Sequence, residues 1–241
     1  MEYSGISIII PAYNEEKYLG KTLEQFRPYR DRFNLEIVVS DDLSADLTVE
    51  TARPLSDRVV LNPGGNRGRS GALNRGVRAA SHDIFIFIDA DIIFRSPETF
   101  YPEVYRVFAG DPEMSGGMTD HWVYPEEETR SDYLAHLIWN GVMRMCARFN
   151  FWLSTPGFQM GRRPWFERIG GYDENMRVIQ DVEYSLRLAR AAKFHYFKTG
   201  ILESPRRYRD EGYLIFTYRS TLRWLNLLFR HRPYGSYKIV R

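Results

Sequence analysis

Two carboxylates separated by one residue, Asp89 and Asp91, follow the apolar run Phe85–Ile88. Because they leave a predicted strand two residues apart, their side chains start on the same side of the chain. Two acids this close repel each other unless a positive charge lies between them, and Mn²⁺ or Mg²⁺ bridging a diphosphate would supply it. A turn followed by a helix N-cap is the alternative, so this triplet alone predicts a metal site without establishing one.

A second acidic pair, Asp41 and Asp42, ends another apolar run. A carboxylate there can accept a hydrogen bond from a nucleobase N–H while the loop Pro11–Glu15 holds the ribose. Helix capping is again the alternative, since Ser44 and Asp46 suit the start of the next helix. We assign Asp46 to capping and Asp41 to the base.

The stretch Gly64–Gly71 is rich in glycine but lacks the Gly-Lys-Ser/Thr ending of a P-loop, which disfavours an ATPase. The first strand is not followed by Gly-x-Gly-x-x-Gly, which disfavours a dinucleotide-binding enzyme. Arg67 or Arg69 could contact a diphosphate, and a solvated surface arginine is the competing explanation for each.

Asp181 and Glu183 lie near the start of a predicted helix. Two acids in a first turn usually complement the helix dipole. If one of them faces the cleft, it can act as general base on an acceptor hydroxyl. The spacing leaves both readings open.

Four strand–helix pairs in series position these residues. They predict a mainly parallel sheet covered on both faces, with ligands at the carboxyl ends of its strands. The predicted pairs are Ile6–Ile10 with Glu15–Phe26, Leu35–Ser40 with Asp46–Ala52, Arg58–Leu61 with Ser70–Ala80, and Ile84–Ile88 with Pro97–Phe108.

The second half of the chain loses this alternation. It contains a predicted strand from Met114 to Val123, an aromatic helix over Ser131–Phe149 and a turn at Pro156-Gly157. We interpret it as an acceptor-binding elaboration. The aromatic and apolar side chains from Ser131 to Leu153 could line an acceptor groove, or they could form core or a dimer interface.

Composition predicts one globular domain, with 44% hydrophobic and 27% charged residues in 241. The single cysteine, Cys146, excludes an internal disulfide and fits a reducing, cytoplasmic setting.

The N-terminus resembles no signal peptide, and no apolar run approaches the ~20 residues of a membrane span. From Gly212 to Arg241 there are six cationic and no acidic residues, which predicts a basic amphipathic helix able to contact the cytoplasmic face of a membrane.

In this order the motifs resemble those of inverting GT-A glycosyltransferases of the family 2 type, from Ile6 to about Phe197. The resemblance implies an α/β, GT-A (Rossmann-like) fold with a mainly parallel sheet flanked by helices. It implies one catalytic domain over 1–241, with a nucleotide-sugar-binding half (1–110), an acceptor-binding half (111–203) and a basic, aromatic C-terminal segment (204–241). The matching motifs are Pro11–Glu15, Asp41–Asp46, Asn66–Gly76, Asp89–Asp91, Gly170–Glu174, and Gln180-Asp181 with Arg187.

The resemblance also assigns roles. Asp89 and Asp91 would hold the ribose, the metal and the diphosphate, and Asp181 would be the general base. Apart from the resemblance, we choose Arg69 over Arg67 as the arginine that contacts the nucleotide sugar. Residues implied to contact the nucleoside are Pro11, Tyr13, Glu15 and Asp41. The chain departs from the family where Gln180 replaces a glutamate and Leu43 replaces a common glycine.

Gln180 suggests an acceptor that needs little base catalysis. A phosphate, whose second pKa is about 6, is already largely ionised at neutral pH. Arginines would then matter more, and two adjacent pairs suit bidentate phosphate capture: Arg162 with Arg163, and Arg206 with Arg207. Solvated surface arginines explain each pair equally well.

Within the family, the features resemble dolichyl-phosphate mannose synthases, although Ile93 stands where those enzymes often have a metal-binding glutamine. The resemblance implies a Mn²⁺- or Mg²⁺-dependent transfer of a hexose from a nucleotide sugar, GDP-mannose before a UDP-sugar, to a polyprenyl or dolichyl phosphate. No nucleic-acid partner is expected. The alternatives are transfer to a soluble sugar or polyol hydroxyl with Asp181 as base, and a non-catalytic nucleotide-sugar-binding protein.

Overall fold

The computed structural model describes residues 4–65, 67–149, 155–176 and 178–205, and seven single residues between 209 and 226. In chain order its elements are β1 (Ile6–Ala12), α1 (Leu19–Glu24), β2 (Leu35–Asp41), α2 (Thr48–Ala52), β3 (Arg58–Leu61), α3 (Arg69–Ala79), β4 (Ile84–Ile88), β5 (Ile93–Phe94), α4 (Pro97–Gly110), β6 (Met114–Val123), α5 (Arg130–Arg148), β7 (Phe158–Arg162), α6 (Arg163–Arg168), α7 (Gln180–Ala191) and β8 (Lys193–Glu203).

The main sheet has five strands in the order β3-β2-β1-β4-β7. The first four are parallel and β7 is antiparallel to β4, so the predicted, mainly parallel sheet is confirmed. A second sheet, β5-β8-β6, was not predicted. It pairs β6 in parallel with β8 and therefore joins segments about eighty residues apart.

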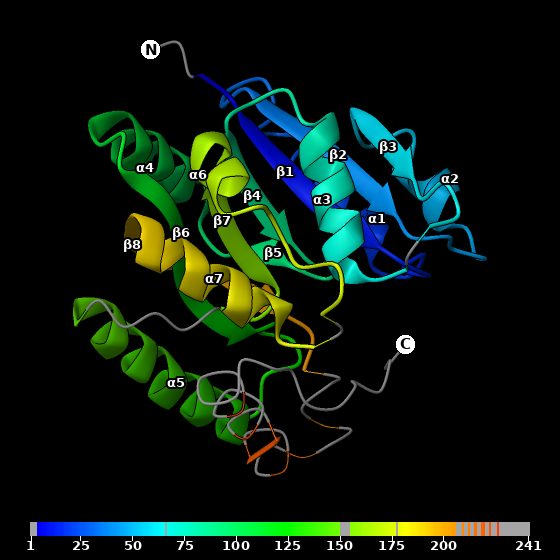
Figure 1. The fold of residues 1–241 in the computed structure, drawn as a ribbon. Coiled ribbons are helices and arrows are strands. Elements are labelled where there is room, and N and C mark those ends of the chain that lie inside the picture. The colour runs from blue at the N-terminus through cyan, green and yellow to red at the C-terminus, as the bar shows by residue number, and fades with distance from the viewer. Residues whose placement is uncertain are drawn as a thin grey trace.

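Both faces of the main sheet are covered by helices (Figure 1). Alternate residues of a strand point to opposite faces, so Ile8 belongs to the core that includes α1, α2 and α4, while its neighbour Ile9 belongs to the core that includes α3, α6 and α7. These two cores fix the sheet and leave the carboxyl ends of the parallel strands for loops that carry polar groups.

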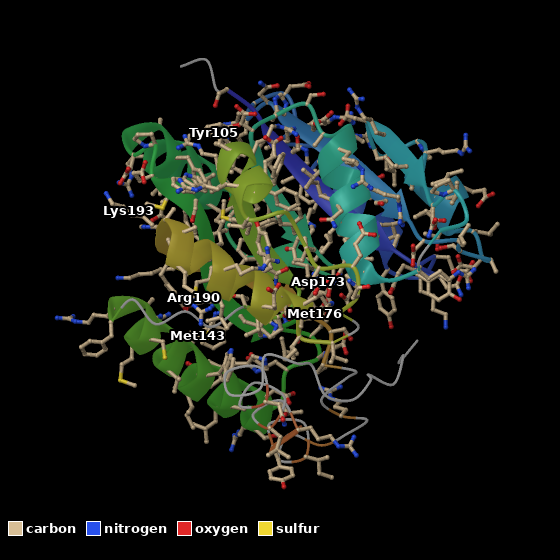
Figure 2. All side chains as sticks on the ribbon, in the orientation of Figure 1. Tyr105, Met143, Asp173, Met176, Arg190 and Lys193 are labelled. Atoms are coloured by element: carbon tan, nitrogen blue, oxygen red, sulfur yellow. The ribbon has the colours of Figure 1, made fainter. Side chains whose placement is uncertain are left out.

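The helix α5 forms an outer layer against the second sheet (Figure 1). It begins with a capping box, in which Thr129 and Asp132 each bond the backbone N–H of the other. Its buried side is short of apolar groups and consists of Asp132, His136, Asn140 and Met143. Figure 2 shows Met143 on the side of α5 that faces the rest of the chain, where it packs against Met118.

Two predicted helices are shorter than expected. The helices α1 and α2 begin at Leu19 and Thr48, because Glu15 and Asp46 at their predicted starts belong to the loops that precede them.

The predicted basic helix lies mostly outside the described residues. Among the residues that the structure describes, no helix is long and apolar enough to cross a membrane.

Candidate active site

The loops after β1 and β2 are joined side by side. The Asn14 N–H donates to Ser44 Oγ over 2.9 Å, and Asn14 Oδ1 accepts from the Ala45 N–H over 2.8 Å. The register of the parallel strands places Ala12 opposite Asp41. The structure therefore brings the predicted nucleoside-binding loop, Pro11–Glu15, next to Asp41.

Asp41 presents an acceptor that its own loop does not use. Its Oδ2 accepts the N–H groups of Leu43 and Ser44 at 3.0 and 3.1 Å. Its Oδ1 is buried and has no hydrogen-bond partner among the described residues. Burying an acceptor without a hydrogen-bond partner costs folding free energy, and a ligand N–H that donates to it would recover that free energy. This arrangement fits the predicted contact with a nucleobase.

The neighbouring Asp42 has a structural role that the sequence analysis did not identify. Its Oδ1 lies 2.7 Å from Arg75 Nη2 and 2.8 Å from Asn62 Nδ2, and its Oδ2 accepts the Gly68 N–H at 2.7 Å. The Arg75–Asp42 ion pair is only about a tenth exposed. Asp42 therefore holds the loop that precedes α3, which is the loop that delivers Arg69.

Arg69, the first residue of α3, reaches the carboxyl end of β4. Its Nε lies 2.8 Å from Asp89 Oδ1, and its Nη1 is buried without a hydrogen-bond partner in the described part of the chain. Burial lowers the pKa of the Arg69 guanidinium, but the carboxylates of Asp89 and Asp181 raise it by more. Arg69 is therefore a cation held against Asp89, with one N–H donor not used by the described residues.

The donor set of Asp89 and Asp91 fits a hard divalent cation, because carboxylate oxygens are the ligands that Mg²⁺ and Mn²⁺ prefer. The backbone here is fixed: the Asp89 N–H donates to the Gly157 carbonyl over 3.0 Å, and the Tyr124 hydroxyl donates to the Asp91 carbonyl. A Cβ at Gly157 would lie 3.5 Å from Asp89 Oδ2, so the glycine leaves room beside that oxygen. The sequence pattern did not connect this glycine with the acids.

Asp181 lies in the first turn of α7, within the electrostatic field of Arg69 and Asp89. Burial raises the pKa of the Asp181 carboxyl, Arg69 and the Val182 N–H lower it, and Asp89 raises it further, with a raised pKa as the result. Ile179, the N-cap residue before α7, has a left-handed φ of 50°, which is uncommon for a β-branched residue and marks a constrained start of the helix. A carboxyl with a raised pKa suits a general base.

The other acid of this turn is already occupied. Glu183 Oε2 lies 2.7 Å from Arg187 Nη2, and the same arginine nitrogen donates to the Gly171 carbonyl over 2.7 Å. Glu183 and Arg187 therefore support the Gly170–Glu174 motif, and the structure leaves Asp181 as the candidate base. Gln180 is buried, and its Oε1 has no hydrogen-bond partner among the residues described.

Arg162 and Arg163 do not reach this site. Arg162 pairs with Ile84 at the start of β4, so it lies at the amino ends of the parallel strands, away from the loops that follow their carboxyl ends. Its guanidinium donates to the carbonyls of Phe108 and Asp111 at 2.6 and 3.1 Å. Arg163 similarly donates to the Ala80 carbonyl at 2.7 Å. Both guanidiniums therefore bond backbone carbonyls at the ends of the strands remote from Arg69 and Asp89, while Arg206 and Arg207 lie outside the described residues.

Gln159 is a site neighbour that the sequence analysis missed. Its Oε1 lies 3.4 Å from Arg69 Nη2. Gln159 stands in an apolar strand with no motif around it, and only the antiparallel pairing of β7 with β4 brings it opposite Phe87, two residues before Asp89. No sequence signal could have identified it.

Known proteins match both the sequence and this architecture. Residues 7–170 match the family model described as glycosyl transferase family 2. The dolichol-phosphate mannosyltransferase of Pyrococcus furiosus is 32% identical over 129 residues, which cover 49% of this chain and 36% of that protein. The glycosyltransferase AglD of Haloferax volcanii is 29% identical over 201 residues, which cover 77% and 31%. This chain therefore spans about a third of the length of these two relatives.

The fold has solved counterparts. The mannosyltransferase PcManGT from Pyrobaculum calidifontis, solved in complex with GDP-Man and Mn²⁺, aligns with a TM-score of 0.66 at 20% identity over 92% of this chain and 65% of that one. At this identity the likeness concerns the fold alone, and it confirms the predicted GT-A architecture.

Proposed function

This chain belongs to glycosyl transferase family 2, and from that premise we propose that it transfers a hexose from a nucleoside diphosphate sugar to an acceptor with inversion at the anomeric carbon. The observation that carries the proposal is the meeting of Arg69, Asp89 and Asp181 at the carboxyl edge of the sheet. It combines a cation for the diphosphate, a carboxylate for a metal and a base for the acceptor.

The donor would lie across the ends of β1, β2 and β4. Asp41 Oδ1 would accept from the base, with Pro11, Tyr13 and Glu15 against the nucleoside. GDP-mannose is the favoured donor, because the Pyrococcus relative is named a mannosyltransferase and PcManGT was solved with GDP-Man. A UDP-sugar is the other candidate.

Asp89 and Asp91 would hold Mn²⁺ or Mg²⁺. Such a cation, when bound, neutralises the charge that develops on the departing diphosphate. Arg69 serves the same end, since its Nη1 can donate to a phosphate oxygen without breaking the 2.8 Å contact of Nε with Asp89.

In the transfer step the acceptor oxygen forms a bond to the anomeric carbon, and the bond from that carbon to the phosphate oxygen breaks with its electron pair leaving on the diphosphate. Attack comes from the face opposite the diphosphate, which inverts the configuration. Asp181 takes the proton of a hydroxyl acceptor. An ionised phosphate acceptor has no proton to lose.

A polyprenyl phosphate is supported as acceptor by the outer face of α5. That face exposes large apolar side chains beside arginines and no acids, which suits an isoprenoid chain at a membrane surface. The exposed residues are Leu134, Leu137, Ile138, Met145 and Phe149, with Arg144 and Arg148.

A soluble sugar or polyol hydroxyl is the second candidate acceptor. The raised pKa of Asp181 favours it, because an acceptor phosphate does not need a base of that kind. The two candidates differ in how strongly Asp181→Asn should reduce transfer.

Thermal unfolding with GDP-mannose, UDP-glucose and other nucleotide sugars, with and without Mn²⁺, tests the donor site. A donor at about 100 times its Kd should stabilise the protein by about 2.7 kcal/mol. We expect a shift for one donor that requires metal and is lost in Asp91→Asn. Transfer assays with a polyprenyl phosphate and with soluble sugars then identify the acceptor. Donor binding without transfer to any acceptor would favour a non-catalytic protein, and no binding would overturn the proposal.

A further inference from the structure

Two histidines and a glutamate meet between α5 and the second sheet. His121 belongs to β6, His136 to α5 and Glu203 is the last residue of β8. One nitrogen or oxygen from each side chain lies within 4.8 Å of the others. His121 Nε2 is 2.9 Å from Glu203 Oε2, and the two imidazole rings lie 5.0 Å apart at an angle of 73°. All three side chains are buried or nearly so.

Each histidine is held in place by other groups. The Asn140 side chain brackets the backbone of His121, accepting from its N–H and donating to its carbonyl, both at 2.9 Å. His136 Nδ1 lies 2.8 Å from the Asp132 carbonyl, so Nε2 is the atom that we assign to the cluster. A backbone carbonyl on the remote nitrogen is the usual way in which a metal-bound imidazole is oriented.

A simple ion pair explains only part of this cluster. His121 and Glu203 would satisfy each other without a second imidazole. His136 instead brings another ring to the pair, on a helix whose other buried residues are Asp132, Asn140 and Met143.

We propose that His121, His136 and Glu203 bind a divalent ion of the zinc class, separate from the oxygen site of Asp89 and Asp91. Two imidazole nitrogens and one carboxylate oxygen suit Zn²⁺, with a fourth position for water, whereas Mg²⁺ and Mn²⁺ prefer oxygen alone. The ion would tie α5 to β6 and β8 and so fix the helix whose apolar face is exposed.

Zinc titration of the tag-free full chain, stripped with chelator, tests this site. Calorimetry and metal analysis should find one Zn²⁺ bound by the wild type and by Asp91→Asn. His136→Gln should weaken that binding about 100-fold or more. Co²⁺ should give the visible absorption of a tetrahedral site in the wild type and not in His136→Gln.

His195→Gln is the matched control. His195 Nε2 lies 3.2 Å from Glu103 Oε1, and no second histidine joins this pair among the residues that the structure describes. It should bind Zn²⁺ like the wild type. If His136→Gln does not fold, Glu203→Gln replaces it, since the amide keeps a hydrogen bond to His121 but not the ligand charge. Undetectable zinc binding by the wild type, equal affinity in a folded ligand variant, or loss of zinc only in Asp91→Asn would overturn the proposal.

Discussion

The Arg69 guanidinium lies against the Asp89 carboxylate, with Nε 2.8 Å from Oδ1. The arginine enters from the first turn of α3 and the aspartate from the end of β4, so two consecutive parts of the fold supply opposite charges to one point. Because Asp181 adds its own field to the same cation, the three residues are coupled. A change in one of them therefore alters the charge balance of the other two.

Arg69→Met should lower kcat/KM by about 10²- to 10³-fold, the usual cost of losing a donor to developing charge. Arg69→Lys should recover part of this loss, because it keeps the charge but not the fork of nitrogens. Steady-state kinetics with the donor that stabilises the protein check the result. Arg163→Met is the control: it also removes an arginine paired with an aspartate, Asp83, but at the far edge of the sheet. Equal losses in both variants would contradict the role of Arg69.

Asp181→Asn should lower transfer activity while it raises the thermal stability of the protein at pH 7. With a hydroxyl acceptor, transfer should fall by about 10²- to 10⁴-fold, whereas a lipid phosphate acceptor should tolerate the change better. Because the folded pKa of Asp181 is raised, the folded state holds this proton more tightly, and stability falls as the pH rises through that pKa.

The same variant should therefore have a higher Tm than the wild type at pH 7. This gain should shrink as the pH falls toward the ordinary aspartate pKa of about 3.9. Scanning calorimetry across this range measures it. A lower Tm at pH 7 would show that the ionised carboxylate stabilises the fold, and the assignment of a raised pKa would fail.

Asp41 and Asp42 are adjacent but should respond differently to substitution. Asp42→Ala removes one side of a buried ion pair with Arg75 and should cost about 3–5 kcal/mol of unfolding free energy. Asp41→Asn should leave stability nearly unchanged and weaken donor binding about tenfold, because it alters one ligand hydrogen bond. Denaturant unfolding and donor titration distinguish the two. Similar unfolding midpoints for both variants would contradict this division of roles.

The sequence predicted the main sheet well, because β1 to β4 are short apolar runs, each followed by a turn and a helix. For the same reason it predicted that the loops after these strands meet, because parallel strands bring their carboxyl ends to one edge. Arg162 was proposed only because it is adjacent to Arg163, and it lies away from that edge because β7 is antiparallel and its last residue is opposite the first residue of β4. Strand direction is not readable from local composition.

The second sheet and the cluster of His121, His136 and Glu203 could not be predicted either, because both depend on long-range strand pairing. His121, His136 and Glu203 are far apart in the sequence and have no common motif. They meet only because β6 pairs in parallel with β8 and α5 returns across both. Long-range pairing of this kind leaves no periodic signal within any one segment.

Ile138→Glu should reduce binding to vesicles that contain anionic lipid and reduce transfer to a polyprenyl phosphate, while transfer to soluble acceptors stays unchanged. Ile138 is 61% exposed on the apolar face of α5, and a carboxylate there opposes both the apolar chain and the anionic surface. Leu47→Glu is matched in exposure, at 63%, and lies outside α5. Vesicle flotation gives the readout, and equal flotation of both variants and the wild type would exclude this face as the contact.

Leu43→Gly should stabilise the protein slightly. Leu43 has φ +68°, a left-handed conformation that costs a residue with a side chain about 1–2 kcal/mol, while glycine loses about 0.5–1 kcal/mol in backbone entropy. The balance predicts a gain of up to about 1.5 kcal/mol, and it explains physically why the resemblance expects glycine at this position. Leu61→Gly, at a half-exposed position in β3, should instead destabilise the chain. Urea unfolding measures both, and a loss of stability in Leu43→Gly as large as that in Leu61→Gly would show that the Leu43 side chain contributes more through packing than its backbone conformation costs.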